Sequence, residues 1–453
     1  MQNINKTFDT LNLSKENISN LTSLGYVTMT PIQQKSLPYI LDKKDVVAKA
    51  NTGSGKTVAF SLGVLDNLDT SLFRIQALIL APTRELASQI TQTLKKLARY
   101  RHNIKILQLT GGVPYKPQVH SLSHQAHIVV GTPGRVLKHL EEKNFTTNNI
   151  NTFVLDEADR MLEMGFVDDI KLIYNYLPQN IHTMFFSATF PQEIEELTKD
   201  FLKNPIKIET LNKTDIDITE KFYKVEYSQK SSLLLKLFDK TYKSIIIFCN
   251  TKQECDTLAD TLEQYDLEPL VLHSDLEQKY RDETLILFSN KSYPILIATD
   301  VASRGLDITD VDMVVNYDIP NSYEIYTHRV GRTARAGKSG IAITFIEDIS
   351  QSDDLFDNIT LEESLDLFTK DDSFPTYEYS TLYINGGKKD KLRAGDILGA
   401  LTAGLKLDKN DIGKIDILPT CSYVAIKNDS YEKAFKGLNQ NKMKNRYFKV
   451  YRR

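Results

Sequence analysis

Short runs rich in β-branched residues, separated by helical stretches, constrain the fold of this chain more than any other feature. The first 208 residues contain six such runs: DVVAKA, ALILAP, KILQLT, HIVVGT, TFVLDE and TMFFSAT. Because these runs are almost continuously apolar and alternate with helices, they predict a parallel sheet covered by helices on both faces. Several runs end in a polar or glycine-containing turn, so we expect ligands at the carboxyl ends of the strands.

A polar stretch at residues 211–219 reads as a linker and precedes a second series of runs. These are SIIIFCN, PLVLHSD, PILIATD, MVVNYD and GIAITFI. The same rhythm predicts a second α/β domain of similar architecture. An acidic stretch follows at residues 347–373, where LEESLDLFTK is expected to form a closing helix. Pro375 then marks a connector, because proline blocks continuation of a helix.

From about Thr381 the pattern predicts a small α+β domain. Its expected elements are strand TLYIN, helix AGDILGALTAGLK, strands IGKIDIL and CSYVAIK, helix SYEKAFKGLNQ and strand YFKVYRR. This β-α-β-β-α-β order is the ferredoxin-like pattern of RNA recognition motifs. The sequence therefore predicts two tandem parallel-sheet α/β domains at residues 1–208 and 218–372, followed by a domain at residues 376–453.

The charge of the chain is divided unevenly. The net charge is −3, yet residues 380–453 hold 16 Lys and Arg against 7 Asp and Glu, and the rest holds 40 against 52. The tail therefore carries +9 and the body −12. Such asymmetry indicates either a tail that binds a polyanion or a lysine-rich solvated surface.

Composition excludes several classes of protein. The sequence contains no apolar run of 18 residues, so no membrane span is predicted. The N-terminal residues do not resemble a signal peptide, and we expect a cytoplasmic protein. Three cysteines are too few for a disulfide framework and match no zinc spacing, so they are interpreted as reduced core thiols.

The segment ANTGSGKT, residues 50–57, directly follows the first strand. It matches a phosphate-binding loop whose first glycine is replaced by Ala50. Gly53 and Gly55 allow the backbone N–H groups, with that of Ser54 between them, to approach phosphate oxygens. Lys56 supplies a charge to the terminal phosphates and Thr57 a hydroxyl ligand for Mg²⁺. The alternative is a glycine-rich turn before a helix.

VLDEAD, residues 154–159, favours the nucleotide interpretation. An apolar strand ends in two carboxylates. The alternative is that they cap the N-terminus of a helix, but a cap does not explain why they occur together with an upstream phosphate loop. Asp156 is suited to the Mg²⁺ shell and Glu157 to polarising an attacking water. Together the two motifs predict hydrolysis of a nucleoside triphosphate.

With these motifs in order, the sequence resembles the DEAD-box RNA helicases from Phe8 to about Gly340. The resemblance implies two RecA-like domains and an RNA-dependent ATPase. It implies that Gln33 hydrogen-bonds adenine and that Phe8 stacks near the base. It also implies that Ser187 and Thr189 of SAT couple hydrolysis to domain movement. Expected RNA contacts of the first domain are Pro82, Thr83, Arg84, Gly111, Gly112, Thr132, Pro133, Gly134 and Arg135.

In the second domain the resemblance implies RNA contacts at Gln278, Arg281 and Thr299, and a ribose contact at Asp307. Arg332 and Arg335 of HRVGRTARAG are expected to reach the terminal phosphate when the domains close. Three positions depart from the usual motifs, namely Asn51, Ser274 and Ala334, and Ser274 places a side chain where glycine is usual.

The tail resembles the RNA-binding domain of the DbpA subfamily through RAGDILGAL (393–401) and DIGKIDI (411–417). This resemblance implies binding to a hairpin of large-subunit ribosomal RNA and a role in assembling that subunit, by a protein that acts as a monomer. Basic candidates for RNA contact are Lys388, Lys389 and Arg393. Tyr423 and Tyr383 are candidate stacking platforms or packed sheet residues; Cys421 stands where an aromatic is usual, which favours another face.

Two alternative functions remain open at this stage. One is a general cold-shock helicase acting on messenger RNA, and the other is an RNA clamp gated by ATP. Glu157 and the expected arginines favour turnover over a clamp.

Overall fold

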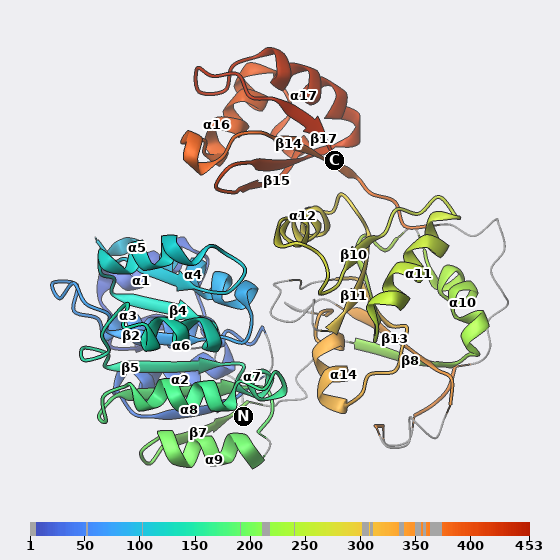
Figure 1. Ribbon diagram of the computed structural model, residues 1–453. Helices are drawn as coiled ribbons and strands as arrows, with labels where there is room; N and C mark the ends of the chain where they lie inside the picture. The colour runs from blue at the N-terminus through green and yellow to red at the C-terminus, as the bar shows by residue number, and fades with distance from the viewer. Residues whose placement is uncertain are drawn as a thin grey trace. The chain divides into compact units, whose positions relative to one another are not determined.

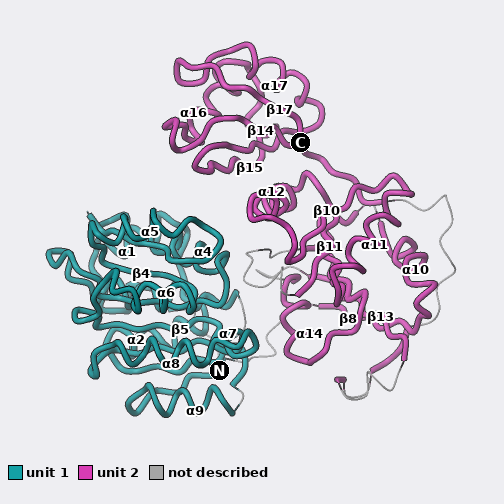
Figure 2. The backbone as a smooth tube through the Cα atoms, viewed as in Figure 1, with its two compact units in different colours: residues 1–214, 304–307 teal, residues 215–303, 308–453 magenta. Residues whose placement is uncertain are grey.

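The computed structural model describes residues 6–50, 53–101, 103–190, 192–210, 218–239, 241–300, 308, 311–334, 339–348, 355–356, 359–362 and 374–453. The chain forms two compact units, shown in different colours in Figure 2. Residues 1–214 and 304–307 make the first unit, and residues 215–303 and 308–453 make the second. Among the described residues, no helix is both long enough and apolar enough to cross a membrane.

Unit 1 is built on a parallel sheet of seven strands in the order β3-β4-β2-β5-β6-β1-β7. Its strands are β1 (Val46–Lys49), β2 (Ala77–Leu80), β3 (Ile106–Leu109), β4 (Ile128–Gly131), β5 (Thr152–Asp156), β6 (His182–Ser187) and β7 (Ile206–Glu209). Its helices are α1 (Lys15–Ser23), α2 (Pro31–Leu41), α3 (Lys56–Asp66), α4 (Arg84–Leu97), α5 (Tyr115–Ser123), α6 (Pro133–Glu141), α7 (Ala158–Glu163), α8 (Val167–Asn175) and α9 (Gln192–Phe201).

Alternate strand residues of unit 1 face two separate cores. Val46 and Ala48 contribute to a core with helices α1 to α4, whereas Val47 faces a core with helices α5 to α9. Burial on both faces is the reason the strands read as continuous apolar runs. The predicted parallel sheet with helices on both sides is confirmed, as Figure 1 shows.

Unit 2 begins with a six-stranded parallel sheet in the order β10-β11-β9-β12-β13-β8. The strands are β8 (Ile218–Lys224), β9 (Ile245–Cys249), β10 (Leu270–Leu272), β11 (Ile295–Thr299), β12 (Met313–Asn316) and β13 (Gly340–Ile346). The described helices around this sheet are α10 (Lys230–Leu237), α11 (Lys252–Glu263), α12 (Gln278–Ser289) and α14 (Tyr323–Val330). Helices α10 and α11 share a core with one face, and α14 shares a core with the other.

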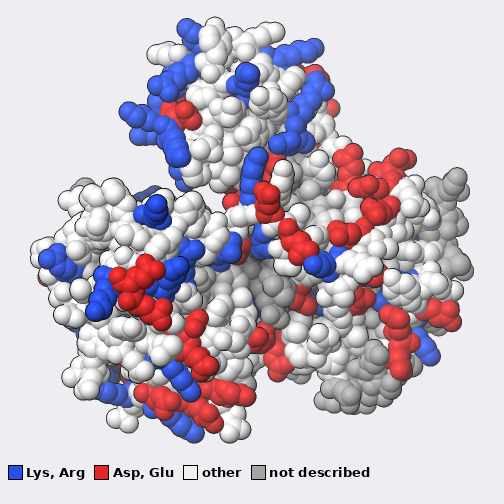
Figure 3. All heavy atoms as spheres, viewed as in Figure 1, with Lys and Arg blue, Asp and Glu red and all other residues white. Residues whose placement is uncertain are grey.

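The C-terminal part of unit 2 is an antiparallel sheet in the order β15-β16-β14-β17. Its elements are β14 (Tyr379–Ile384), α16 (Ala394–Gly399), β15 (Ile412–Ile417), β16 (Ser422–Lys427), α17 (Asn428–Gln440) and β17 (Val450–Arg452). The predicted β-α-β-β-α-β order is confirmed. Both helices share one core with the sheet, and Lys and Arg side chains gather over this domain (Figure 3).

The second face of the C-terminal sheet packs on α12. Ile286 of α12 shares a small core with Cys421 and Tyr423. Polar contacts surround it: Arg453 Nε lies 2.5 Å from Glu283 Oε1, and Asn290 Nδ2 donates to Thr381 Oγ1 at 2.7 Å. An apolar centre with a polar rim is the composition of a specific interface. The tail is therefore joined to α12 by side-chain contacts.

The sequence missed two strands. β7 pairs with β1 although its residues alternate in burial and contain two charges, and β8 begins at Ile218, inside the stretch expected to be a linker. Both are edge strands, where one unpaired side permits polar residues that hide the signal. Residues 211–217 and most of LEESLDLFTK lie outside the described residues, and the domain boundaries remain predictions.

Candidate nucleotide and RNA sites

The loop between β1 and α3 has the backbone that a phosphate site requires. Gly53 and Gly55 have φ values of +81° and +94°, in the left-handed region that favours glycine. Gly55 is the N-cap of α3, so the unpaired N–H groups at the start of this helix follow it directly. A side chain at Gly55 would also collide with Gln33. Thr57 lies in the first turn of α3 and Ser54 in the loop, as expected from the sequence.

Several buried polar atoms in and beside this loop have no hydrogen-bond partner among the described residues. Among them are Ser54 Oγ and the charged pair of Lys56 Nζ and Asp156 Oδ1. Burial raises the pKa of Asp156 to about 7, and the Lys56 ammonium opposes this shift. Buried charged groups without partners are costly. The pair therefore fits a ligand that brings both phosphate oxygens and a cation.

Glu157 is held by a partner that the sequence reading missed. Arg160 Nη1 donates to Glu157 Oε2 at 2.8 Å, and both side chains are buried. Glu157 itself has φ +54° and ψ +52°, a conformation that costs about 1–2 kcal/mol in a residue other than glycine. The strain turns the chain sharply between β5 and α7. The i, i+3 spacing of acid and base is the signal that identifies Arg160.

Asp159 joins the acidic motif to SAT. Its Oδ2 accepts hydrogen bonds from the backbone N–H groups of Ala188 and Thr189, at 3.1 and 2.8 Å, and from Thr189 Oγ1 at 3.1 Å. Its own N–H donates to Ser187 Oγ at 3.1 Å. The structure thus places Ser187 and Thr189 beside the candidate catalytic carboxylates. The sequence reading assigned no role to Asp159, although it is part of the quoted motif.

The expected adenine-binding residues have partners within unit 1. Gln33 Nε2 donates to the carbonyl of Gly55 at 3.1 Å, and Gln33 Oε1 accepts from Thr30 N–H at 2.9 Å. Gln33 therefore touches the phosphate loop directly. Phe8 is 2% exposed and lies in the core shared with helices α1 to α4, so its ring is not open as a stacking face in this structure.

The expected RNA contacts of the first domain follow three neighbouring strands. Pro82 to Arg84 come after β2, Gly111 and Gly112 after β3, and Thr132 to Arg135 after β4. Since β3, β4 and β2 are adjacent and parallel, these segments share one edge of the sheet. A side chain at Gly112, which has φ +70°, would collide with the guanidinium of Arg84. Gly112 thus makes room for the guanidinium of Arg84.

The nucleotide residues occupy the other half of the same edge. The phosphate loop follows β1, the acidic motif follows β5, and SAT follows β6, all adjacent in the sheet. The edge therefore divides into a candidate phosphate-binding half and a half that carries Arg84 and Arg135, which is suited to a nucleic-acid backbone.

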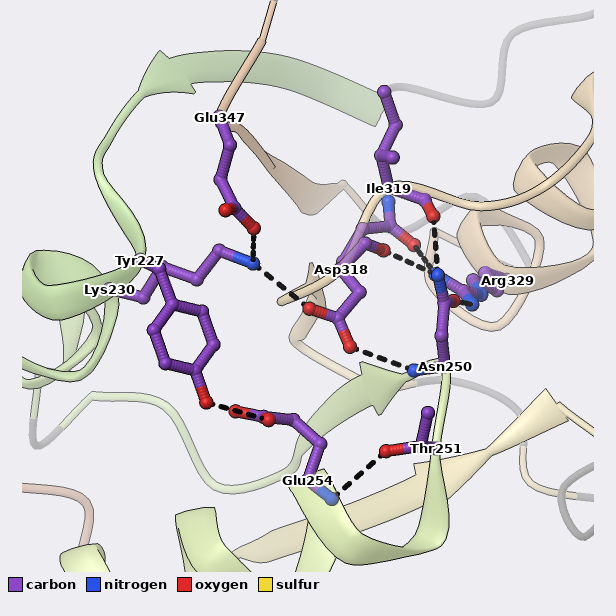
Figure 4. Close-up of polar contacts among 10 residues, drawn as sticks. Tyr227, Lys230, Asn250, Thr251, Glu254, Asp318, Ile319, Arg329 and Glu347 are labelled. Atoms are coloured by element: carbon purple, nitrogen blue, oxygen red, sulfur yellow. Dashed lines mark hydrogen bonds and ion pairs between the residues drawn. The ribbon is translucent and has the colours of Figure 1, made fainter. Parts of the chain in front are cut away.

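Unit 2 contains a polar network around the buried side chains of Arg329 and Lys230, at the carboxyl ends of its central strands (Figure 4). Arg329 donates to both carboxylate oxygens of Asp300 at 2.7 Å, to Asn250 Oδ1 at 2.8 Å and to the carbonyl of Asp318 at 2.8 Å. Lys230 closes the network through Asp318 Oδ1 at 2.9 Å. The sequence reading assigned roles to other arginines of this motif and missed Arg329.

The remaining candidate residues of the second domain lie on different elements. Thr299 ends β11 and is buried, and Arg332 follows α14 and is 3% exposed. Gln278 and Arg281 lie on the first turn of α12, where Gln278 Nε2 donates to Asp282 Oδ1 at 2.8 Å. Asp307 and Arg335 lie outside the described residues.

Tyr423 was a candidate either for stacking on bases or for packing in the sheet. In this structure it is 2% exposed and packs against Ile286 of α12, which favours the packing alternative. Lys388, Lys389 and Arg393 instead lie on the loop after β14. The loop between α17 and β17 meets this one, because Lys444 Nζ donates to the carbonyl of Lys391 at 2.5 Å.

Three family models match the chain in succession. A DEAD/DEAH box helicase model matches residues 30–197, a helicase conserved C-terminal domain matches residues 229–337, and a DbpA RNA-binding domain matches residues 381–452. With the geometry above, these matches show that the chain belongs to the DbpA subfamily of DEAD-box ATP-dependent RNA helicases.

The chain is 45% identical to the ATP-dependent RNA helicase DbpA of Escherichia coli (strain K12), covering 98% of both chains. It is 34% identical to DbpA of Bacillus subtilis (strain 168), again over 98% of both. The structure of S. cerevisiae Dbp5 bound to RNA and ADP BeF3 has a TM-score of 0.70 at 31% identity, covering 77% of this chain and 91% of that chain. The structure of Mss116p bound to ssRNA and AMP-PNP has a TM-score of 0.69 at 30% identity, covering 78% of each.

Proposed function

We propose that this ATP-dependent RNA helicase remodels large-subunit ribosomal RNA during assembly of that subunit, directed by its tail to an RNA hairpin. The observation that carries the proposal is full-length similarity, tail included, to DbpA. DEAD-box helicases named CshA, such as that of Bacillus anthracis, are 40% identical over only 343 residues, 75% of this chain. The match to DbpA thus extends over the whole length of this chain, and the match to CshA over three quarters of it.

The tail offers a basic surface away from its covered sheet face. The loop of Lys388, Lys389 and Arg393 meets the loop that carries Lys444, and Tyr447 in the second loop is 66% exposed. Lysines placed around an exposed aromatic ring suit phosphates and a splayed base. We expect the hairpin to bind here.

The ATP chemistry is assigned to residues of unit 1. Lys56 contacts the terminal phosphates, Glu157 orients the attacking water, and Arg160 fixes Glu157 at 2.8 Å. Thr57 and Asp156 are the ligands that would hold Mg²⁺, and the unpartnered Asp156 Oδ1 supports this assignment. When bound, Mg²⁺ would neutralise charge that develops on the phosphates.

Activation by RNA is assigned to closure of the two domains. Arg332 and Arg335 would stabilise the transition state only in the closed form, which is worth about 10³–10⁵ in rate for an arginine finger. RNA that contacts both domains favours closure, so hydrolysis depends on RNA. The core contacts follow phosphate and sugar and carry no base sequence, so recognition depends on the tail.

The test compares the ATPase rate of the full-length protein with two RNAs. One is a large-subunit ribosomal fragment that contains hairpins, and the other is an unstructured RNA of equal length. We expect the ribosomal fragment to act at a lower concentration. Equal concentrations for half-maximal stimulation would favour the general cold-shock helicase, and a turnover equal to that of the Glu157→Gln variant would favour the ATP-gated clamp.

A charge variant locates the recognition surface. Replacing Lys388, Lys389 and Arg393 with glutamine should raise the concentration of ribosomal RNA needed, but not that of unstructured RNA. Lys406, Lys409 and Lys427 of the same domain, replaced together, are the matched control for loss of three positive charges. An equal effect of both triple variants would show that only net charge matters.

A further inference from the structure

A buried amide joins two of the RNA-facing segments of unit 1. Gln118 lies on α5 and is 7% exposed. Its Nε2 donates to the carbonyl of Thr110, directly before Gly111, at 3.0 Å. Its Oε1 accepts from Arg135 Nη1 at 3.3 Å. One side chain therefore contacts both the segment after β3 and the helix after β4.

A third contact fixes the orientation of that amide. His139 Nε2 lies 2.9 Å from Gln118 Oε1, and Asn144 Nδ2 lies 3.3 Å from His139 Nδ1. Because Oε1 only accepts and the Asn144 amide only donates through Nδ2, His139 carries its proton on Nε2. Burial, with Arg135 and Lys138 nearby, lowers the pKa of His139 to about 4, so the ring is neutral near pH 7.

The His139 ring is itself held in place. It stacks on Tyr115, with centroids 4.3 Å apart and planes at 16°, and Asn144 Nδ2 also donates to Tyr115 Oη at 2.8 Å. The guanidinium of Arg135 lies 5.2 Å from the centroid of the same Tyr115 ring. The amide and the ring therefore hold Arg135 from two directions, which limits the rotamers open to a long cationic side chain.

We infer that Gln118 is a positioning residue for RNA, which sets the Thr110–Gly112 segment and the Arg135 guanidinium at one fixed separation along the RNA backbone. The inference rests on the proposed RNA contacts of this sheet edge. Two phosphate-binding elements held at a fixed separation lose less freedom when RNA binds than two independent ones. Gln118 therefore acts on RNA affinity and leaves the ATP chemistry alone.

The test replaces Gln118 with leucine, which has nearly the same shape and no polar atoms. The matched control is Gln76→Leu. Gln76 is 1% exposed, and its Nε2 donates to the carbonyls of Asp69 and Leu72 at 2.7 and 2.8 Å. It directly precedes β2 and so lies at the amino ends of the strands, opposite the candidate RNA contacts. Both changes remove a buried amide, so both lower thermal stability.

We expect Gln118→Leu to raise the RNA concentration for half-maximal ATPase stimulation about tenfold, equivalent to about 1.4 kcal/mol, with kcat changed less than about twofold. Gln76→Leu should leave that concentration unchanged. The ¹⁵N chemical shifts of His139 should show the Nε2–H form in the wild type and a mixture in Gln118→Leu.

Gln118→Glu supplies a second variant should the leucine variant not fold. It keeps the acceptors for Arg135 and His139, but a carboxylate oxygen replaces the donor and is repelled by the carbonyl oxygen of Thr110, so this variant should also raise the RNA concentration. A wild type that RNA does not stimulate would overturn the proposed function. If RNA stimulates the wild type, two results would overturn the positioning role. One is an equal RNA concentration for half-maximal stimulation in Gln118→Leu and Gln76→Leu, and the other is an equal concentration in Gln118→Glu and wild type.

Discussion

Asp159→Asn should separate ATP hydrolysis from strand separation. The carboxylate accepts three hydrogen bonds on Oδ2 from residues of SAT, and its Oδ1 accepts one from the N–H of Arg160 at 3.0 Å. Asparagine has one oxygen, so its NH₂ group must face at least one buried N–H donor in either orientation. An unsatisfied buried group costs about 1–3 kcal/mol.

We expect about 2–3 kcal/mol of lost stability from this change. At about 2–4 °C per kcal/mol for a domain of this size, Tm of the first domain should fall by about 4–12 °C. The hydrogen bonds of the Asp159 carboxylate described above reach SAT and the N–H of Arg160, so the change should act mainly on SAT and hydrolysis should be largely preserved. If SAT couples hydrolysis to domain movement as we propose, strand separation should fall about tenfold further than hydrolysis, equivalent to about 1.4 kcal/mol.

The assay measures ATPase rate and duplex unwinding under the same conditions, with a thermal melt of each protein. Thr189→Val is the control, because it removes one hydroxyl bond and keeps both backbone donors; its Tm should fall by no more than about a third as much. If Asp159→Asn reduces unwinding and hydrolysis in equal proportion, the carboxylate does not link the two motifs.

Three further predictions follow from the same geometry. Arg160→Met should lower RNA-stimulated kcat about tenfold to a hundredfold, because Glu157 loses its partner at 2.8 Å, and Arg160→Lys should lower kcat less. Equal values of kcat in the wild type and both variants would contradict this. In the protein without nucleotide, the pKa of Asp156 is raised, so between about pH 4 and 7 the folded state holds a proton that the unfolded state releases. The free energy of unfolding should therefore fall with rising pH in this range, by up to about 4 kcal/mol. Thermal melts over this range should show the slope in the wild type and not in Asp156→Asn. Gly112→Ala should raise the RNA requirement through collision with Arg84, whereas Gly25→Ala, at φ +86° with open space around it, adds only backbone strain and should leave RNA stimulation unchanged.

The sequence indicated the chemistry of this protein because the relevant residues are close together in the chain. A strand followed by glycines and Lys56, or by Asp156 and Glu157, carries its chemistry within a few residues, and the parallel sheet brings those segments to one edge. The alternation of strands and helices indicated the sheets for the same reason, since period and length are local properties.

The tertiary structure decided how these segments are joined. Asp159 meets Thr189 thirty residues later, and Gln118 meets Arg135 seventeen residues later, through side chains whose roles have no local signature. From its strand alone Tyr423 could either stack on bases or pack in the sheet, and its contact with Ile286, far away in the chain, is what buries it. Local sequence determines which side chains lie at the end of a strand. Whether those side chains are buried, and which residues they contact, depends on segments that are distant in the chain and meet only when it has folded.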